Sequence, residues 1–183
     1  MRKQQREAIL ALLEETYMGT ETALNYSTPF ELLVAVIMSA QCTDERVNKI
    51  TARIFPKYNT PEKMGALSQE QLEEEIRGCG LFRSKAKNLL ATCKMLTEEY
   101  NSVIPDTVEE LMKLPGVGKK TANVVASIVY KVPAIAVDTH VFRVSHRLGL
   151  ANGDDPLAVE KELQKAIPKN KWSDAHHWLI WHG

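Results

Sequence analysis

The sequence predicts an all-α fold, and three observations favour it. Apolar residues recur at helical spacing along most of the 183 residues. Serine, threonine and aspartate residues, often followed by proline or by an acid or amide three positions later, precede these apolar stretches and indicate helix starts. The only strand-like segment, residues 132–137, has no second strand to pair with, so we interpret it as an extended link. Roughly ten helices are therefore expected.

The first helices follow from capping signals near the start of the chain. Residues 2–15 place apolar side chains at helical spacing. Thr28 and Glu31 form the pattern of a capping box, with Pro29 at the first helical position. The helix that they open, residues 32–39, is nearly all apolar, so we expect it to lie buried at the centre of its domain. Later helix starts are expected at Thr43 or Asp44, Thr60, Ser68, Ser84, Thr107, Asp138, Asp155 and near Ser173.

The composition is that of an ordinary water-soluble protein of one or two small domains. The hydrophobic share is 44%, the charged share is 25% and the formal net charge is zero. The N-terminus lacks the long apolar core of a secretory signal, and the longest apolar run, residues 32–38, is too short to span a bilayer. Cys42, Cys79 and Cys93 show no metal-like spacing, so we expect reduced thiols in the cytoplasm and no membrane association.

Residues 111–125, with the sequence LMKLPGVGKKTANVV, form the most informative stretch of the chain. Pro115 ends one helix, and a second helix begins at about Lys119. Gly116 and Gly118 permit positive φ and let a ligand approach the backbone N–H groups closely. A helix start also favours negative charge through its macrodipole. We interpret the turn as a seat for a nucleic-acid phosphate. The side chains around this seat are Lys119, Lys120 and Thr121.

Charged residues are unevenly distributed, although they cancel overall. An acidic patch is formed by Glu70, Glu73, Glu74 and Glu75. Basic residues flank two turns: Arg77, Arg83, Lys85 and Lys87 at residues 78–80, and Lys113, Lys119 and Lys120 at residues 115–118. We therefore expect a locally basic cleft with modest, salt-dependent DNA binding. Gly-Cys-Gly at 78–80 precedes a helix as the other turn does, which indicates either a second phosphate-facing turn or a coincidence.

The string Leu-Pro-Gly-Val-Gly-Lys-Lys-Thr-Ala at 114–122, followed by Val-Asp-Thr-His-Val at 137–141, resembles the helix-hairpin-helix of DNA-repair glycosylases. It is similar to the endonuclease III family in particular. The resemblance covers essentially the whole chain and implies two helical lobes with a DNA cleft between them. One lobe would be a six-helix barrel at 22–132, with the helix-hairpin-helix at 107–130. The other lobe would comprise residues 1–21 and 133–183.

The resemblance also implies an activity, the removal of oxidised pyrimidines from DNA followed by nicking of the strand. Lys120 would attack the sugar C1′ as a free amine and form a Schiff base, from which β-elimination cuts the backbone. The helix dipole, partial burial and the neighbouring Lys119 would favour the neutral amine. Asp138 would stabilise the sugar cation and move protons for Lys120, although its carboxylate would favour the charged amine. From the residues alone, Lys120 could instead bind phosphate and Asp138 could be only a helix cap.

An enzyme that acts on a base must take it out of the stack, and a side chain must fill the gap. Gln41 and Leu81 match the family positions that do this. Without the resemblance, they would be interpreted as a loop amide and a core leucine. The resemblance implies that Ser39, Asp44 and His140 line the base pocket. The remaining residues that it implies in DNA binding surround the glycine turn: Leu114, Gly116, Val117, Gly118, Lys119 and Thr121.

The cofactors differ from those of most family members. These usually continue past the His-His-Trp-Leu-Ile helix into a four-cysteine loop that holds a [4Fe-4S] cluster, whereas this chain stops at Gly183 without those cysteines. Either the chain is truncated or it is a cluster-free member. In both cases we expect weaker DNA affinity and an exposed apolar edge near Trp178 and Trp181.

No other cofactor is expected in this chain, apart from a monovalent cation held by the carbonyl groups of residues 114–117, as the family implies. His176, His177 and His182 do not favour a metal site, because adjacent side chains on a helix diverge. We interpret them as buried histidines that form hydrogen bonds.

The resulting hypothesis is a base-excision-repair DNA glycosylase and apurinic/apyrimidinic (AP) lyase. It would act as a monomer on double-stranded DNA with a damaged or abasic nucleotide, in the cytoplasm and associated with the nucleoid. Two alternatives stay open. A monofunctional mismatch adenine glycosylase generally lacks the lysine at position 120. A non-catalytic helix-hairpin-helix DNA-binding protein would need the phosphate seat but not Asp138, Gln41 and Leu81.

Overall fold

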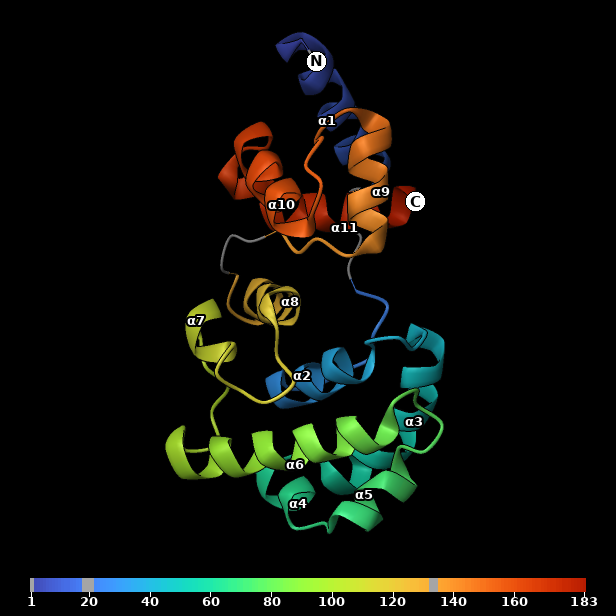
Figure 1. Ribbon diagram of the computed structural model, residues 1–183, viewed down its shortest axis with the longest axis vertical. Coiled ribbons are helices and arrows are strands. Elements are labelled where there is room, and N and C mark those ends of the chain that lie inside the picture. The colour runs from blue at the N-terminus through green and yellow to red at the C-terminus, as the bar shows by residue number, and fades with distance from the viewer. Residues whose placement is uncertain (1, 18–21, 132–134) are drawn as a thin grey trace. The chain divides into compact units, whose positions relative to one another are not determined.

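The computed structural model describes residues 2–17, 22–131 and 135–183 (Figure 1). These residues form eleven α-helices and one short 3-10 helix, and no strand occurs among them. The all-α prediction is confirmed. None of the described helices is long and apolar enough to cross a membrane. The chain divides into two compact units: a central unit, Ala23–Val125, and a terminal unit, Met1–Thr22 with Ala126–Gly183.

The central unit is built around a fully buried helix, as the sequence predicts. Nine of the ten residues of α2 (Pro29–Met38) are buried. The long helix α6 (Phe82–Glu99) packs against α2 and lies along α4 and α5 (Figure 1). The other helices of this unit are α3 (Asp44–Tyr58), α4 (Pro61–Gly65), α5 (Gln69–Glu75), α7 (Val108–Leu111) and the first part of α8 (Lys119–Tyr130).

The terminal unit has its own hydrophobic core, to which α1 (Lys3–Tyr17) contributes Leu13. The core continues through α9 (Thr139–Leu148), α10 (Pro156–Ala166) and α11 (Trp172–His182), with η1 (Lys169–Lys171) before α11. Trp178 belongs to this core and is only 3% exposed, so its expected place on an exposed apolar edge is wrong. Trp181, in contrast, is 53% exposed, as expected.

Most predicted helix starts are confirmed by capping hydrogen bonds. Ser68 and Gln71 form a complete, reciprocal capping box. The side chains of Thr28, Thr43, Thr60, Thr107, Asp138 and Asp155 each accept the backbone N–H three residues on. Ser84 is a wrong prediction, because the N-cap position of α6 is Leu81, three residues earlier, which has the left-handed conformation and forms no side-chain cap. A local capping signal was overridden there by a turn that depends on contacts with another loop.

The expected lobe boundaries, 22–132 against 1–21 plus 133–183, stay a prediction. Residues 18–21 and 132–134, where both boundaries fall, lie outside the described residues. Residues 135–137 of the predicted link are buried and belong to no helix or strand.

Candidate nucleic-acid interface

The hairpin turn, residues 114–118, joins α7 to α8 and leaves backbone accessible at its glycines. Gly116 has a φ of 80°, in the left-handed region that favours glycine. A Cβ at Gly118 would meet no atom within 4 Å, so the space beside it is open. The side chains of Leu114 and Val117 are buried and anchor the turn in the core. These two residues therefore offer a ligand their backbone, not their side chains.

Helix α6 packs against this turn and contacts it through two side chains. The Thr92 hydroxyl donates a 2.9 Å hydrogen bond to the carbonyl oxygen of Pro115. A Cβ at Gly116 would lie 3.0 Å from both Cβ and Nδ2 of Asn88, so the turn approaches α6 as closely as only glycine allows. The pattern around the turn gave no sign of Asn88 and Thr92, although both stand near Leu89 in the helical register that marks the buried face.

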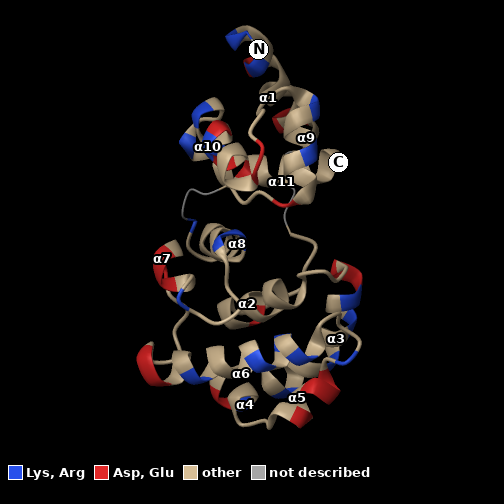
Figure 2. Cartoon of the chain, viewed as in Figure 1, with Lys and Arg blue, Asp and Glu red and all other residues tan. Residues whose placement is uncertain are grey.

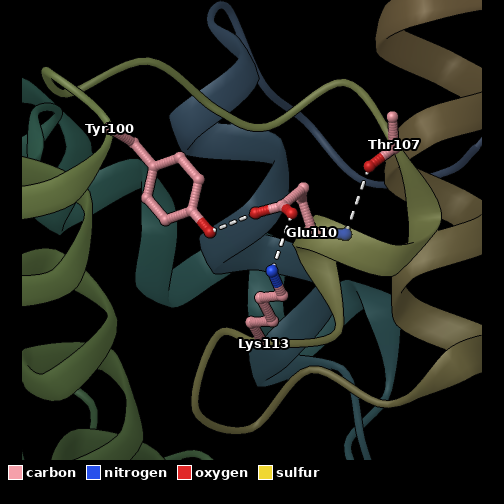
Figure 3. Close-up of polar contacts among 4 residues, drawn as sticks. All are labelled: Tyr100, Thr107, Glu110 and Lys113. Atoms are coloured by element: carbon pink, nitrogen blue, oxygen red, sulfur yellow. Dashed lines mark hydrogen bonds and ion pairs between the residues drawn. The ribbon is translucent and has the colours of Figure 1, made fainter.

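Lys113, which was expected to contribute positive charge beside the hairpin turn, is held by an acidic neighbour (Figure 3). Its ammonium group lies 2.7 Å from Glu110, whose carboxylate also accepts a 2.6 Å hydrogen bond from Tyr100. The Lys113 hydrogen bond lowers the pKa of Glu110, and the same contact raises the pKa of Lys113. Thr107 caps the backbone N–H of Glu110, as its predicted place at a helix start requires, whereas the carboxylate of Glu110 is turned toward Lys113 and Tyr100.

The proposed nucleophile stands in the first turn of the helix that follows the hairpin turn. Lys119 and Lys120 are both exposed, and Thr121 is half-buried. The partial burial expected for Lys120 is not seen, since the residue is exposed. The helix start remains favourable for a phosphate through its N–H groups and dipole.

Asp138 is confirmed as the N-cap of α9. Its Oδ1 accepts a 2.8 Å hydrogen bond from the backbone N–H of Val141, and the residue is half-buried. The buried residues 135–137 precede it and fix where the helix starts. His140, two positions on, is exposed, with its Nδ1 3.4 Å from the Arg143 guanidinium. Lys120 belongs to the central unit and Asp138 to the terminal unit.

Two loops of the central unit, residues 39–42 and 78–81, lie against each other, and we call them the paired loops. A Cβ at Gly80 would lie 3.0 Å from the carbonyl oxygen of Gln41. Gln41 and Leu81 both have positive φ, 55° and 59°, which costs a non-glycine residue roughly 1–2 kcal/mol. Leu81 is 58% exposed, so its interpretation as a core leucine is wrong. Backbone strain of this kind is common at binding and active sites.

Two other residues expected at the base pocket lie near these loops. Ser39 is half-buried and donates a 2.8 Å hydrogen bond to the carbonyl oxygen of Val36 at the end of α2. Asp44 is exposed in the first turn of α3, and Thr43 rather than Asp44 caps that helix. Their predicted roles stay predictions.

Of the four cations expected to form a basic surface beside residues 78–80, Lys85 is wrong, and two others are paired with acidic neighbours at the surface. Lys85 is buried, Arg77 forms an ion pair with Glu74 at 2.8 Å, and Arg83 forms one with Glu73 at 3.5 Å. Figure 2 shows acidic residues on α5 and basic residues on the adjacent helix α6. Because Lys85 is buried, it cannot contribute positive charge to a second phosphate-binding turn at residues 78–80. The sequence signal that could have placed Lys85 inward is its spacing from Leu89 and Leu96 on one helix face.

The thiols do not fit an iron–sulfur cluster. No group of three or more histidine, cysteine or acidic residues that could hold a metal ion occurs in the described part of the chain. Burial raises the pKa of the Cys79 thiol and raises that of Cys93 to about 12, which disfavours the thiolate that a cluster needs. His176 is buried, with its Nδ1 2.8 Å from the carbonyl oxygen of Ala136, so its interpretation as a buried hydrogen-bonded histidine is confirmed. For His182 the same interpretation is wrong, because that residue is exposed; its Nδ1 lies 3.0 Å from the Tyr17 hydroxyl.

Comparison with known sequences places these features in context. The family model for the HhH-GPD superfamily base excision DNA repair protein matches residues 34–169. Endonuclease III of Rickettsia prowazekii is 49% identical over 183 residues, which are 100% of this chain and 86% of that relative. Endonuclease III of Bacillus subtilis is also 49% identical, over 98% of this chain and 82% of that relative.

Solved structures of DNA-repair enzymes also match this chain. A trapped endonuclease III–DNA covalent intermediate matches with a TM-score of 0.96 and 52% sequence identity, over 100% of this chain and 86% of that chain. A thermostable thymine-DNA glycosylase matches with a TM-score of 0.82 at 19% identity, which shows a shared fold.

Proposed function

Because this chain belongs to the endonuclease III family within the HhH-GPD superfamily, and is therefore a base-excision-repair DNA glycosylase and AP lyase, we propose that Lys120 is its nucleophile and oxidised pyrimidines are its substrates. The observation that carries this proposal is the position of Lys120. Its exposed side chain stands two residues after the open backbone of Gly118, where a bound phosphate would bring the sugar of a nucleotide within reach.

The reaction starts with a lone pair on the Lys120 nitrogen. Attack on C1′ breaks the glycosidic bond, and the damaged base leaves with the bonding electrons and takes up a proton. The nitrogen then loses a proton, and its lone pair breaks the C1′–O4′ bond as O4′ takes up a proton, which leaves a protonated Schiff base between Lys120 and the opened sugar. Removal of a proton from C2′ then expels the 3′ phosphate, which nicks the strand by β-elimination. Water finally releases the lysine.

Asp138 supports this chemistry with the carboxylate oxygen that does not take part in the helix cap. Its Oδ1 is taken by the N–H of Val141, and Oδ2 retains its lone pairs for the cationic sugar or for a proton from Lys120. The cap also fixes the side chain, so a charged oxygen is held in place before substrate arrives.

DNA binding uses the hairpin turn and the paired loops of the central unit, together with His140 of the terminal unit. The hairpin turn and Lys119 hold phosphate, with a hydrogen bond from Thr121. A monovalent cation there is supported by the carbonyl oxygens of Leu114 and Pro115, each of which accepts one hydrogen bond and keeps a second lone pair. Gln41 and Leu81 fill the gap in the base stack, while Ser39, Asp44 and His140 line the base pocket. The protein acts as a monomer on damaged duplex DNA at the nucleoid.

Borohydride trapping tests the nucleophile. Wild-type protein is mixed with duplex DNA that carries thymine glycol or an abasic site, in the presence of borohydride, which reduces a Schiff base to a stable adduct. We expect adducts with the wild type and with Lys119→Gln, and none with Lys120→Gln. An adduct that persists in Lys120→Gln would remove Lys120 from this role.

A second variant separates catalysis by Asp138 from capping. Asparagine caps helices about as well as aspartate, so Asp138→Asn should leave thermal stability nearly unchanged. We expect its single-turnover base excision to fall at least about a hundredfold, because the charge is lost. Full activity in this variant would reduce Asp138 to a structural cap.

A further inference from the structure

We propose that Lys85 is a positioning residue that holds the paired loops together and so fixes Gln41 and Leu81 for base eversion. This inference rests on the proposed role of those two side chains in filling the gap in the base stack. Lys85 itself is only 5% exposed, so it acts on DNA through the loops rather than by contact.

The Lys85 ammonium group connects the two loops directly. It donates to the carbonyl oxygens of Met38 at 2.8 Å and Ala40 at 2.5 Å, which stand at the end of α2 and in the first loop. It also lies 3.2 Å from the Sγ atom of Cys79 in the second loop. Cys79 in turn donates from its thiol to Met38 at 3.1 Å. One side chain therefore ties residue 40 to residue 79.

This arrangement satisfies a buried cation. An ammonium group has three donors, and here three acceptors surround it. Two of these acceptors lie at the C-terminal end of α2, where the helix dipole favours positive charge. Burying a charge without such partners is unfavourable, so Lys85 holds its acceptors in place as firmly as they hold it.

Each of the two tied loops contains a strained residue. Gln41 follows Ala40, and Leu81 follows Cys79 and Gly80; both have positive φ. Left-handed non-glycine residues persist only when their surroundings determine them strongly. Further contacts close the loops on either side: the Arg46 guanidinium donates to the Gly78 carbonyl at 3.1 Å, and Cys42 donates its N–H to Ser39 at 3.2 Å. Lys85 is the member of this set that bridges both loops.

The same helix face also serves the hairpin turn. Thr92, which bonds Pro115, stands seven residues after Lys85 on α6, a rise of about 10 Å. Helix α6 thus carries the support of the paired loops near its start and the support of the phosphate seat at its middle. Loss of Lys85 should disturb the first surface and leave the second intact.

The test compares excision of a stacked base with cleavage at a site that has none. Lys85→Met keeps the length of the side chain and removes its donors. We expect its single-turnover excision of paired thymine glycol to fall about tenfold or more, while β-elimination at a preformed abasic site falls less than threefold, because an abasic site needs little unstacking. Affinity for undamaged duplex should change less than about twofold, because the hairpin turn is retained.

Three comparisons make this result decisive. Met64→Ala, in a fully buried position of α4, supplies a destabilised protein whose two activities should fall equally if at all. Lys85→Arg should recover part of the excision rate, because it restores a buried donor. If Lys85→Met does not fold, Lys85→Gln is measured in its place. An equal fall of excision and abasic-site cleavage, or no fall in either, would overturn the role of Lys85.

Gln41→Ala and Leu81→Ala separate this inference from the proposed function. If both variants lose excision selectively and the Lys85 variant does not, the inference fails while the role of the two loop residues stands. If neither loses excision selectively, the proposed role of Gln41 and Leu81 fails.

Discussion

The hairpin turn and the paired loops rest on the same helix, α6, but they reach the left-handed conformation by different means. The hairpin turn does so at Gly116, where the missing Cβ removes the strain. The paired loops do so at Gln41 and Leu81, which have side chains and bear the strain. The difference matches what each surface offers. A phosphate is bound by bare backbone, whereas a gap in a base stack can be filled only by a side chain.

The contacts that hold the two surfaces in place also differ, and the strained paired loops have the stronger set. Thr92 and Asn88 hold the hairpin turn by one neutral hydrogen bond and by close packing. The paired loops are held by a buried ammonium group with three acceptors, which is a stronger set of contacts. Strained backbone requires stronger support, because its unstrained alternatives are lower in energy.

Among the substitutions that distinguish the two surfaces, Gly116→Ala should have the largest effect on DNA affinity. Its Cβ would press on Asn88 at 3.0 Å and would meet the cost of positive φ, together about 2 kcal/mol or more of unfolding free energy. We expect affinity for undamaged duplex, measured by fluorescence anisotropy, to fall about tenfold or more. Gly118→Ala is the matched control, because its Cβ meets open space and should leave stability nearly unchanged. Unchanged DNA affinity in Gly116→Ala would contradict the phosphate seat.

Leu81→Gly should separate activity from stability. The side chain is 58% exposed, so little burial is lost, and glycine relieves the left-handed strain. We expect the melting temperature to stay equal or rise, while excision of paired thymine glycol falls about tenfold. Leu114→Ala, at a fully buried leucine of the hairpin turn, should instead lose about 2–5 kcal/mol of unfolding free energy. A stability loss of that size in Leu81→Gly would show that Leu81 is a packing residue.

Two similar ion pairs allow the smallest and sharpest test. Glu110 pairs with Lys113 before the hairpin turn, and Glu74 pairs with Arg77 before residues 78–81; both are exposed pairs three residues apart. Glu110→Gln frees Lys113 beside the phosphate seat, so we expect duplex affinity at low salt to rise about twofold to threefold, with a steeper salt dependence. Glu74→Gln should change it less. An equal rise in both would indicate that phosphate is bound at both surfaces.

Local chemistry made much of the fold predictable. Thr60, Ser68 and Asp155 cap helices because a short polar side chain reaches a backbone N–H three residues on, whatever else the chain does. The nearly unbroken apolar run of α2 required burial on every side. The hairpin turn was predictable for the same reason, since proline fixes its own φ and glycine allows a positive φ, both within a few residues.

Long-range contacts decided the rest. Lys85 looked like a surface cation, and only the carbonyl groups of Met38 and Ala40, more than forty residues away in sequence, make its burial favourable. Leu81 begins α6 in place of the predicted Ser84 cap, in a loop that Gly80 brings against Gln41.

The sequence by itself therefore determined where most helices begin and where the chain turns between α7 and α8, because capping and dihedral limits act over a few residues. Tertiary structure alone decided which lysine is buried, which leucine is exposed and which loops support each other. Those outcomes depend on partners that the neighbouring sequence does not contain.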